Sequence, residues 1–374
     1  MSNLVHAPQW FGGGLGNEFF PYSKACIAAQ VTGGDLYFPV HLDFVRKRSY
    51  FLPEWRRTLK NRFGIREVIY YRAEDYDLDV ESTGTLDYAV NVSRFCDNLN
   101  SKKTLVVHGG MRGGFASIIR GREFVRTRLL SRQVVARRYA DLMSRLDPQK
   151  LTVAIHIRRG DFKEKPSQEL TTKAHSKPGR LSPGHLFKKY LSFNEYNFSG
   201  LGIQRSKDAK TKWNQQTPIG WFESAIRQIS HQYGENLQFI LVSDGLSAAE
   251  NKVLNATLNG YDVTHGDSHL PDLDLLLLGS ADALLCSTSS FSMWGAFLAN
   301  SLYVFNADHL SHSEDQTLYL WDRPENDSSV DPQAGYAVGE GGVLAASFFE
   351  AMNLRQRQRD LAGQGLLFGQ EISV

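Results

Sequence analysis

Two adjacent arginines follow an apolar run that predicts a buried β-strand. The run is Leu151–Ile157, and Arg158 and Arg159 come directly after it. His156 and Arg158 are two residues apart, so strand geometry places both side chains on one side. Guanidinium groups at the carboxyl end of a strand can hold a diphosphate through paired hydrogen bonds and offset the charge of a departing one. A structural ion pair between Arg159 and Asp161 is the alternative, and spacing alone leaves it open.

A glycine-rich segment, Gly12–Gly16, precedes a helical pattern over residues 20–30. Glycines let backbone N–H groups approach an anion at the start of a helix, and Asn17 would add an amide donor. A dinucleotide-binding turn requires a strand before it, and Val5–Phe11 is a poor strand because it contains Pro8. The segment by itself therefore gives weak support to a Rossmann oxidoreductase, which NAD binding would revive.

The segment Asp274–Trp294 combines a helix, a strand and a Ser/Thr-rich turn that opens another helix. Hydroxyl groups and backbone amides at such a helix start suit a phosphate. Ordinary N-capping by Ser289, Ser290 or Ser292 accounts for the same residues. Residue types alone leave both readings open.

Alternating strand and helix patterns predict an α/β fold with a parallel, doubly wound sheet. The first half shows strands at Leu105–His108 and Val68–Tyr71 and an amphipathic helix over residues 126–146. Strand and helix patterns also alternate in the second half, at Trp221–Tyr233, Gln238–Val242, Ala248–Leu258, Leu273–Ala281, Ala283–Cys286, Ser292–Leu298 and Leu302–Phe305. Such a sheet binds ligands at the carboxyl ends of its strands, which is where Arg158 would lie.

We expect two domains and a tail. Residues 1–150 form an N-terminal Rossmann-like domain and residues 151–345 a C-terminal one, interrupted by a polar insertion at about 163–216. The insertion carries aromatic residues that could stack on the apolar face of a ligand, and a lid or an oligomer contact is an equal alternative. Residues 346–374 are predicted to form a C-terminal helix and tail that pack on the N-terminal domain.

Bulk composition excludes several function classes. The chain has 374 residues and a net charge of +2, so no global field draws it to nucleic acid or to an anionic membrane. Its cysteines, Cys26, Cys96 and Cys286, form neither a zinc pattern nor a disulfide framework. Residues 1–10 lack a signal-peptide pattern, and no apolar stretch is long enough to span a membrane. We predict a cytoplasmic protein and leave peripheral attachment to a membrane open.

Four motifs in one order resemble the α1,2-fucosyltransferase family, glycosyltransferase family 11. They are GGLGNE, HIRRGDF, FILVSDGLS and STSSFSMWGAFL, which lie between residues 12 and 305. More distantly the motifs look like those of α1,6- and protein O-fucosyltransferases. The resemblance implies a GT-B fold, with two Rossmann-like domains facing a cleft. It also implies inverting, metal-independent transfer of fucose from GDP-fucose to a glycan acceptor, with an α1,2 linkage to galactose.

The resemblance also implies residue roles. His156 would contact the guanosine, Arg158 would hold the β-phosphate as the main catalytic electrophile, and Arg159 would lie beside it. Asp274 would accept the guanine N1–H and N2–H₂, as a carboxylate can in bidentate fashion. Asn17 is a further catalytic candidate, which with the Gly14–Gly16 loop would face the fucose and the acceptor across the cleft. Ser289, Ser290 and Phe291 would line the diphosphate turn, and Asp161 and Asp244 are further candidates for substrate binding.

Glu18 departs from the family pattern, in which glutamine is common at this place. An acid there could act as the general base that deprotonates an acceptor hydroxyl, and a structural hydrogen bond is the alternative. Asp244-Gly245 and Met293-Trp294 also differ, since relatives commonly have two acids and two tryptophans. The competing functions are a transferase for another GDP-sugar and a non-catalytic protein that binds a GDP-sugar or a glycan.

Overall fold

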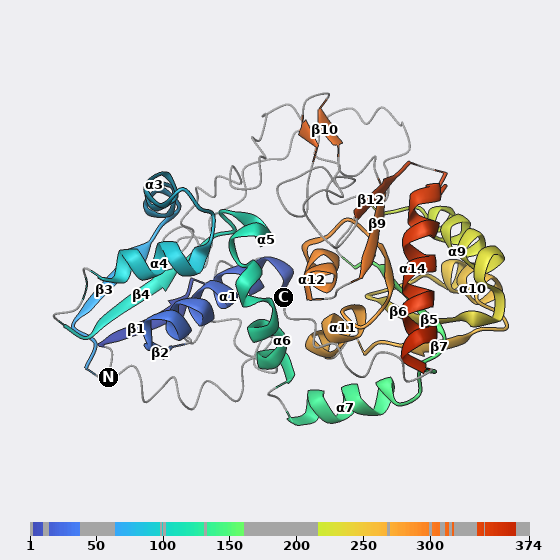
Figure 1. Ribbon diagram of the computed structural model, residues 1–374, viewed down its shortest axis with the longest axis horizontal. Helices are drawn as coiled ribbons and strands as arrows, with labels where there is room; N and C mark the ends of the chain where they lie inside the picture. The colour runs from blue at the N-terminus through green and yellow to red at the C-terminus, as the bar shows by residue number, and fades with distance from the viewer. Residues whose placement is uncertain are drawn as a thin grey trace, which may run out of the picture.

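Two parallel sheets follow one another along the chain (Figure 1). The computed structural model describes residues 3–9, 15–37, 64–97, 99, 102–130, 133–160, 216–267, 270–298, 301–306, 311–313, 316–317, 335–339 and 341–363. Gly14, Asp161 and residues 161–215 of the insertion therefore lie outside the described residues. The predicted α/β fold with Rossmann-like parallel sheets is confirmed.

The first sheet has the order β2-β1-β4-β3, and all its strands run parallel. Its strands are β1 (Leu4–Pro8), β2 (Asp35–Leu36), β3 (Glu67–Tyr71) and β4 (Thr104–His108). The helices of this half are α1 (Leu15–Thr32), α3 (Ala73–Thr83), α4 (Tyr88–Asp97), α5 (Gly114–Ser117), α6 (Arg122–Leu130) and α7 (Gln133–Met143), with a 3₁₀ turn, η1 (Ile119–Gly121), before α6.

The central strand β1 was missed in the sequence. All five residues of Leu4–Pro8 are buried and in register with β4, and Val5 and His6 also pair with β2. Pro8 has no N–H to donate, but it is the final residue of the strand, where only one ladder bond is lost. The expectation that Pro8 prevents a strand here was therefore wrong.

The second sheet has the order β12-β9-β8-β5-β6-β7 and is also parallel. Its strands are β5 (Leu151–Ile157), β6 (Leu237–Ser243), β7 (Asp262–His265), β8 (Ala283–Cys286), β9 (Leu302–Asn306) and β12 (Gly335–Val338). The helices are α9 (Ile219–Tyr233), α10 (Ala248–Thr257), α11 (Pro271–Leu278), α12 (Ser290–Leu298) and α14 (Ala346–Gly363), with the 3₁₀ turn η4 (Gly234–Asn236). A short antiparallel pair joins β10 (Ser311–Ser313) to β11 (Gln316–Thr317).

Alternate residues of β5 face two different helix layers. Val153, Ile155 and Ile157 belong to a core shared with α9, α10 and α14, whereas Ala154 belongs to a core shared with α11 and α12. Both layers are apolar, so the strand is buried throughout. This explains its continuous apolar sequence. His156 is on the same side as Ala154, the side of α12.

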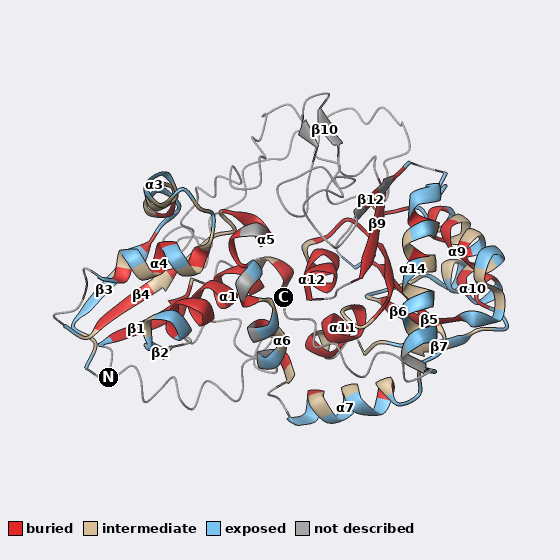
Figure 2. Ribbon diagram, viewed as in Figure 1, coloured by how far each residue is buried: buried red, intermediate tan, exposed pale blue. Residues whose placement is uncertain are grey.

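The helix predicted over residues 126–146 is in fact two helices. α6 ends at Leu130 and α7 begins at Gln133. Leu129, Val135 and Leu142 are all buried, so one apolar stripe continues across the break. Periodicity could not reveal the break for that reason. The outer side of α7 is exposed (Figure 2).

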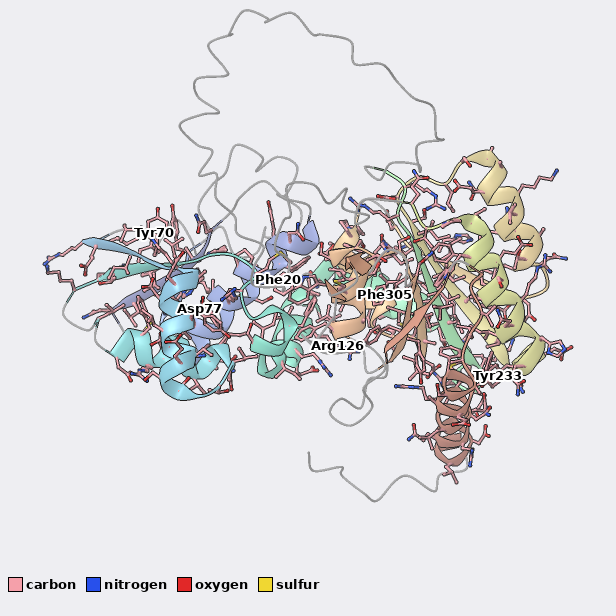
Figure 3. The ribbon with its side chains drawn as sticks, turned by 90° about the horizontal axis from the view of Figure 1, so that it is seen from above. Phe20, Tyr70, Asp77, Arg126, Tyr233 and Phe305 are labelled. Atoms are coloured by element: carbon pink, nitrogen blue, oxygen red, sulfur yellow. The ribbon has the colours of Figure 1, made fainter. Side chains whose placement is uncertain are left out.

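One apolar core runs through both halves of the chain. Phe20 and Phe115 of the first half pack on Trp294 of α12, with ring centroids 5.0 Å from it in both cases. Phe297 of α12 also contacts Phe115 at 5.0 Å. α11 and α12, which lie between the two sheets, are buried almost throughout (Figure 2). Figure 3 shows Phe20 on the side of the first half that faces the second.

The C-terminal helix α14 packs on the second sheet. Phe348 and Met352 join the core formed with α9, and Arg359 forms an ion pair with Asp282 at 2.6 Å. The expectation that this helix packs on the N-terminal domain was therefore wrong. Among the described residues, no helix combines the length and apolar character that crossing a membrane requires.

Candidate functional site

The order in which the chain adds strands to the second sheet reverses at β5. β6 and β7 follow on one side of β5, whereas β8, β9 and β12 lie on the other. The connections after β5 and β8 leave on opposite faces of such a sheet, and the carboxyl ends between them form its ligand-binding position. Here that position lies between Arg158, just after β5, and the turn Ser287–Ser289, just after β8.

Serine hydroxyls tie the end of β8 to the end of β5 and to α12. The Ser287 hydroxyl accepts the backbone N–H of Arg158 at 3.0 Å. The Ser289 hydroxyl accepts the N–H of Ser292 at 3.2 Å, which is ordinary N-capping of α12. The first N–H groups of a helix have no partners within it, so this turn presents a positive helix end beside Arg158.

The protonation of His156 follows from its contacts. The Ser292 hydroxyl donates to the Ser287 carbonyl oxygen at 2.7 Å. Its only hydrogen is therefore used, and it must accept from Nδ1–H of His156. The pKa of His156 is lowered to about 3, mainly by burial. The Asp244 charge opposes this shift and the Arg158 charge adds to it, so the ring is neutral. Nε2 is left as a hydrogen-bond acceptor, and the centroid of the His156 ring lies 5.3 Å from that of Phe291.

Asp244 positions Arg158. One carboxylate oxygen forms an ion pair with the Arg158 Nε at 3.1 Å, and the other accepts the backbone N–H groups of Arg159 and Gly160 at 2.6 and 3.1 Å. The carboxylate thus fixes the turn after β5. We assign it to positioning in place of the predicted substrate contact. The Arg158 side chain is 26% exposed, which leaves its guanidinium within reach of a ligand.

Arg159 is held in the protein interior. Its side chain is 5% exposed and forms an ion pair with Glu250 of α10 at 2.6 Å. A second nitrogen donates to the Thr217 carbonyl oxygen at 2.9 Å. Consecutive residues at a strand end point to opposite sides, so Arg158 and Arg159 cannot both face α12. The ionic partner of Arg159 is Glu250, and this contact opposes the predicted place of Arg159 beside the β-phosphate, which stays a prediction.

Asp274 lies at the carboxyl ends of β6 and β7. It is 4% exposed, and one oxygen accepts the N–H of Asp267 at 2.7 Å. A Cβ on Gly266 would meet this carboxylate and would come within 3.0 Å of Val242. Burial raises the pKa of Asp274 to about 6. The charges of Asp267 and Asp272 add to that increase, and the Asp267 N–H opposes it. Among the residues that the structure describes, nothing hydrogen-bonds to the second oxygen.

The N-terminus of α1 meets the N-terminus of α12. The Gly16 carbonyl oxygen accepts the indole N–H of Trp294 at 2.6 Å. A Cβ on Gly16 would lie 2.6 Å from both the Phe291 nitrogen and the Ser290 hydroxyl oxygen, so only glycine allows this approach. The contact brings the first sheet to the ligand-binding position of the second. Asn17 is partly buried at this junction.

Glu18 is fully buried, with 0% of its surface exposed. A general base must meet the acceptor hydroxyl from which it takes a proton. The burial of Glu18 opposes that role, and we assign it a structural one. The other predicted candidates, Gly14 and Asp161, lie outside the described residues, so the structure places neither of them.

Some residues of the site went unrecognised in the sequence. Ser287 and Ser292 fix the tautomer of His156, and Glu250 neutralises Arg159. The sequence carried a signal for Glu250, because Ser247 and Glu250 have the spacing of a capping box and form one at the start of α10. No sequence signal identifies the serine contacts, since they join segments more than 100 residues apart.

The sequence argued against a dinucleotide-binding turn because no good strand precedes Gly12–Gly16, and the presence of β1 removes that reason. Two other observations still oppose that reading. No arrangement of the glycines in residues 12–18 gives the G-x-G-x-x-G spacing. Gly16 is also occupied in packing on α12.

Comparisons with known proteins find only solved structures of low similarity among the matches given below. No family model and no curated protein matches the chain. It is similar to the NodZ α1,6-fucosyltransferase soaked with GDP-fucose, at TM-score 0.42 and 13% identity over 80% of this chain and 94% of that one. The fucosyltransferase NodZ from Bradyrhizobium gives TM-score 0.37 and 14% identity over 80% and 94%. POFUT1 in complex with GDP-fucose gives 0.39 and 11% over 89% and 97%.

Proposed function

We propose that this protein transfers fucose from GDP-fucose to a hydroxyl group of a glycan, with inversion at the anomeric carbon. The observation that carries the proposal is the position of Arg158, accessible at the switch point of the second sheet and next to the N-terminus of α12. A guanidinium and a helix N-terminus together suit a diphosphate. The described residues of the four fucosyltransferase-like motifs contact one another at this position.

The donor would lie along the carboxyl ends of the strands. Asp274, beyond β6 and β7, accepts the guanine N–H groups, while the diphosphate lies between Arg158 and α12. The acceptor atom Nε2 of His156 receives a hydrogen bond from the guanosine. Because His156 is neutral, it orients the donor and transfers no proton.

Departure of the diphosphate is the step that the site favours. The acceptor hydroxyl attacks the anomeric carbon on the face opposite GDP while the bond to the β-phosphate oxygen breaks. Negative charge then grows on the diphosphate, where Arg158 stabilises it. Since Glu18 is buried, we assign no general base, and the acceptor proton passes to solvent or to the leaving phosphate. Asn17 and the Gly14–Gly16 segment are proposed to face the fucose.

The test is a screen of the purified protein with GDP-fucose, GDP-mannose and GDP-glucose against terminal galactosides. We propose galactose as the acceptor sugar and expect fucosylated product with an α1,2 linkage, identified by NMR. Transfer should continue in a chelator, because this proposal needs no metal. Transfer from GDP-mannose alone would correct the donor sugar. Binding of GDP without transfer or donor hydrolysis would support a non-catalytic sugar-nucleotide-binding protein instead.

GDP affinity should depend on the charge of Asp274. Above a pH of about 6 the carboxylate is ionised and offers two acceptors; below it the acid is protonated and loses one. We expect the Kd for GDP to rise by up to about tenfold per pH unit below 6. Asp274→Asn should weaken GDP binding by about 10- to 100-fold at pH 7.5 and remove the pH dependence. Titration calorimetry at several pH values measures both effects.

The matched control is Asp262→Asn, at an exposed position of β7 paired with Lys150. It should leave the Kd for GDP unchanged at every pH. ADP, which lacks the guanine donors, should bind weakly to all three proteins. Equal affinity of wild type and Asp274→Asn for GDP would remove Asp274 from the donor site.

A further inference from the structure

The carboxyl ends of β1 and β4 lie side by side in the first sheet, because these two strands are parallel neighbours. β4 ends at His108 and leads into residues 109–113, the 109–113 loop. Gln9, directly after β1, donates its backbone N–H to the His108 carbonyl oxygen at 2.8 Å. The end of β1 and the start of the loop therefore lie side by side.

The Gln9 side chain lies against this loop. A Cβ on Gly109 would meet the Gln9 carboxamide oxygen, so the glycine makes room for that side chain. Gln9 is partly exposed. A carboxamide offers both a donor and an acceptor, and a sugar hydroxyl needs both. The chemistry of this edge suits a ligand rich in hydroxyl groups.

A buried lysine holds the 109–113 loop from the inside. Lys24 of α1 is 2% exposed, and its ammonium group donates to the carbonyl oxygens of Arg112 at 2.9 Å and Gly110 at 3.3 Å. The same group lies over the rings of Tyr88 and Tyr76, 5.1 and 5.7 Å from their centroids. A buried charge is costly unless it is compensated, and these two carbonyls and two rings offset part of that cost. Burial and the Arg112 charge lower the pKa of Lys24 to about 7, and Asp77 opposes that shift.

The outer side of the loop is also held. Arg112 makes two hydrogen bonds of 2.7 Å to Asp77 of α3, in bidentate geometry. Asp77 lies in the first half, away from the second sheet (Figure 3). Gly110 and Gly113 have φ values of 67° and 77°, the left-handed conformation that glycine adopts without strain. The loop is therefore fixed by charged contacts on two sides.

The 109–113 loop also adjoins the donor side of the molecule. α5 begins at Gly114, directly after the loop, and its Phe115 contacts Phe20 and Trp294 at ring-centroid distances of 4.6 and 5.0 Å. Trp294 in turn holds the Gly16 carbonyl oxygen. One aromatic cluster thus joins the loop to the junction of α1 and α12.

We propose that Gln9 and the 109–113 loop bind hydroxyl groups of the acceptor glycan, and that Lys24 is the positioning residue that keeps the loop in place. The proposal rests on the transfer reaction proposed above and identifies the part of the first sheet that meets the acceptor. Gln9 contacts the sugar, whereas Lys24 acts only through the loop carbonyls.

The test compares Gln9→Ala and Lys24→Met with Lys150→Met, a control substitution of the partly exposed lysine directly before β5. The first two variants should raise KM for the best galactoside of the screen by about tenfold and change kcat by less than about threefold. The Kd for GDP should stay at the wild-type value in all three. Amide hydrogen exchange over residues 109–117 should become faster in Lys24→Met alone.

Two further readouts keep the test decisive. If Lys24→Met does not fold, Asp77→Asn replaces it, because this exposed substitution frees Arg112 and should raise the same KM. An unchanged acceptor KM in the folded variants, or a parallel loss of GDP affinity, would overturn the acceptor assignment. Transfer by the wild-type protein is measured before any variant is compared. Its absence would overturn the proposed function itself.

Discussion

Replacing Arg158 with alanine should reduce turnover by about 100-fold or more and leave GDP-fucose binding measurable. A donor aimed at a departing diphosphate contributes roughly 3–4 kcal/mol to the transition state, because the charge it meets is largest there. The side chain is partly exposed and its ionic partner Asp244 keeps two backbone N–H donors, so the fold should survive. Steady-state kinetics with a coupled GDP assay gives kcat, and thermal unfolding checks the fold.

Arg159 and Arg138 provide contrasting controls. Arg138→Ala, on the exposed side of α7, should change nothing measurable in turnover. Arg159→Ala leaves the Glu250 side chain 20% exposed and still bonded to Ser247, so it should lower stability by about 1–3 kcal/mol. Arg159→Ala should therefore lower the free energy of unfolding and leave the kcat of the folded fraction nearly unchanged. Near-normal turnover of Arg158→Ala would remove this arginine from the reaction.

Gly16→Ala should destabilise the protein, opposite to the effect that helix propensity alone predicts. Alanine favours a helix over glycine by about 1 kcal/mol. At Gly16, however, the new Cβ would lie 2.6 Å from the Phe291 nitrogen, and backbone must move to relieve it. Such overpacking costs about 1–3 kcal/mol. Separation of α1 from α12 should also lower turnover by about tenfold or more, because Arg158 and the helix end lose their shared geometry.

Gly220→Ala is the matched control for this substitution. Gly220 is the second residue of α9, as Gly16 is of α1, and nothing lies within 4 Å of a Cβ added there. The control should be neutral or slightly stabilising in urea unfolding, with normal turnover. If Gly16→Ala behaves like Gly220→Ala in both measurements, the close approach of the two helix ends has no role in the site.

Elements with one unambiguous pattern could be predicted from the sequence, and elements that depend on partners could not. The bounds of β5 and β8 agree with the prediction because each is a short apolar run buried on both faces. β1 was missed because the effect of Pro8 depends on whether it falls inside or at the end of a strand. The break between α6 and α7 was missed because the apolar stripe is continuous across it.

For the site, the sequence identified the segments but not which side chains face the ligand. Arg158 and Arg159 are chemically alike, and only the alternation of the chain at the end of β5 separates the exposed one from the buried one. The acid Glu18 gave no sign of its burial, which results from the packing of α1 against the rest of the molecule. The tautomer of His156 can be assigned only when the hydrogen bond of the Ser292 hydroxyl is known. That contact joins segments far apart in the sequence, so the sequence does not show it.

The shared core of the two halves has a consequence for how the chain can be divided. A fragment ending at residue 150 would expose to water Phe20 and Phe115, whose rings pack on Trp294. Each large apolar side chain exposed in this way loses about 1.5–3 kcal/mol of burial free energy. The halves should therefore melt together in one transition, and a chimaera that exchanges one half with a relative would have to exchange the matching aromatic residues as well.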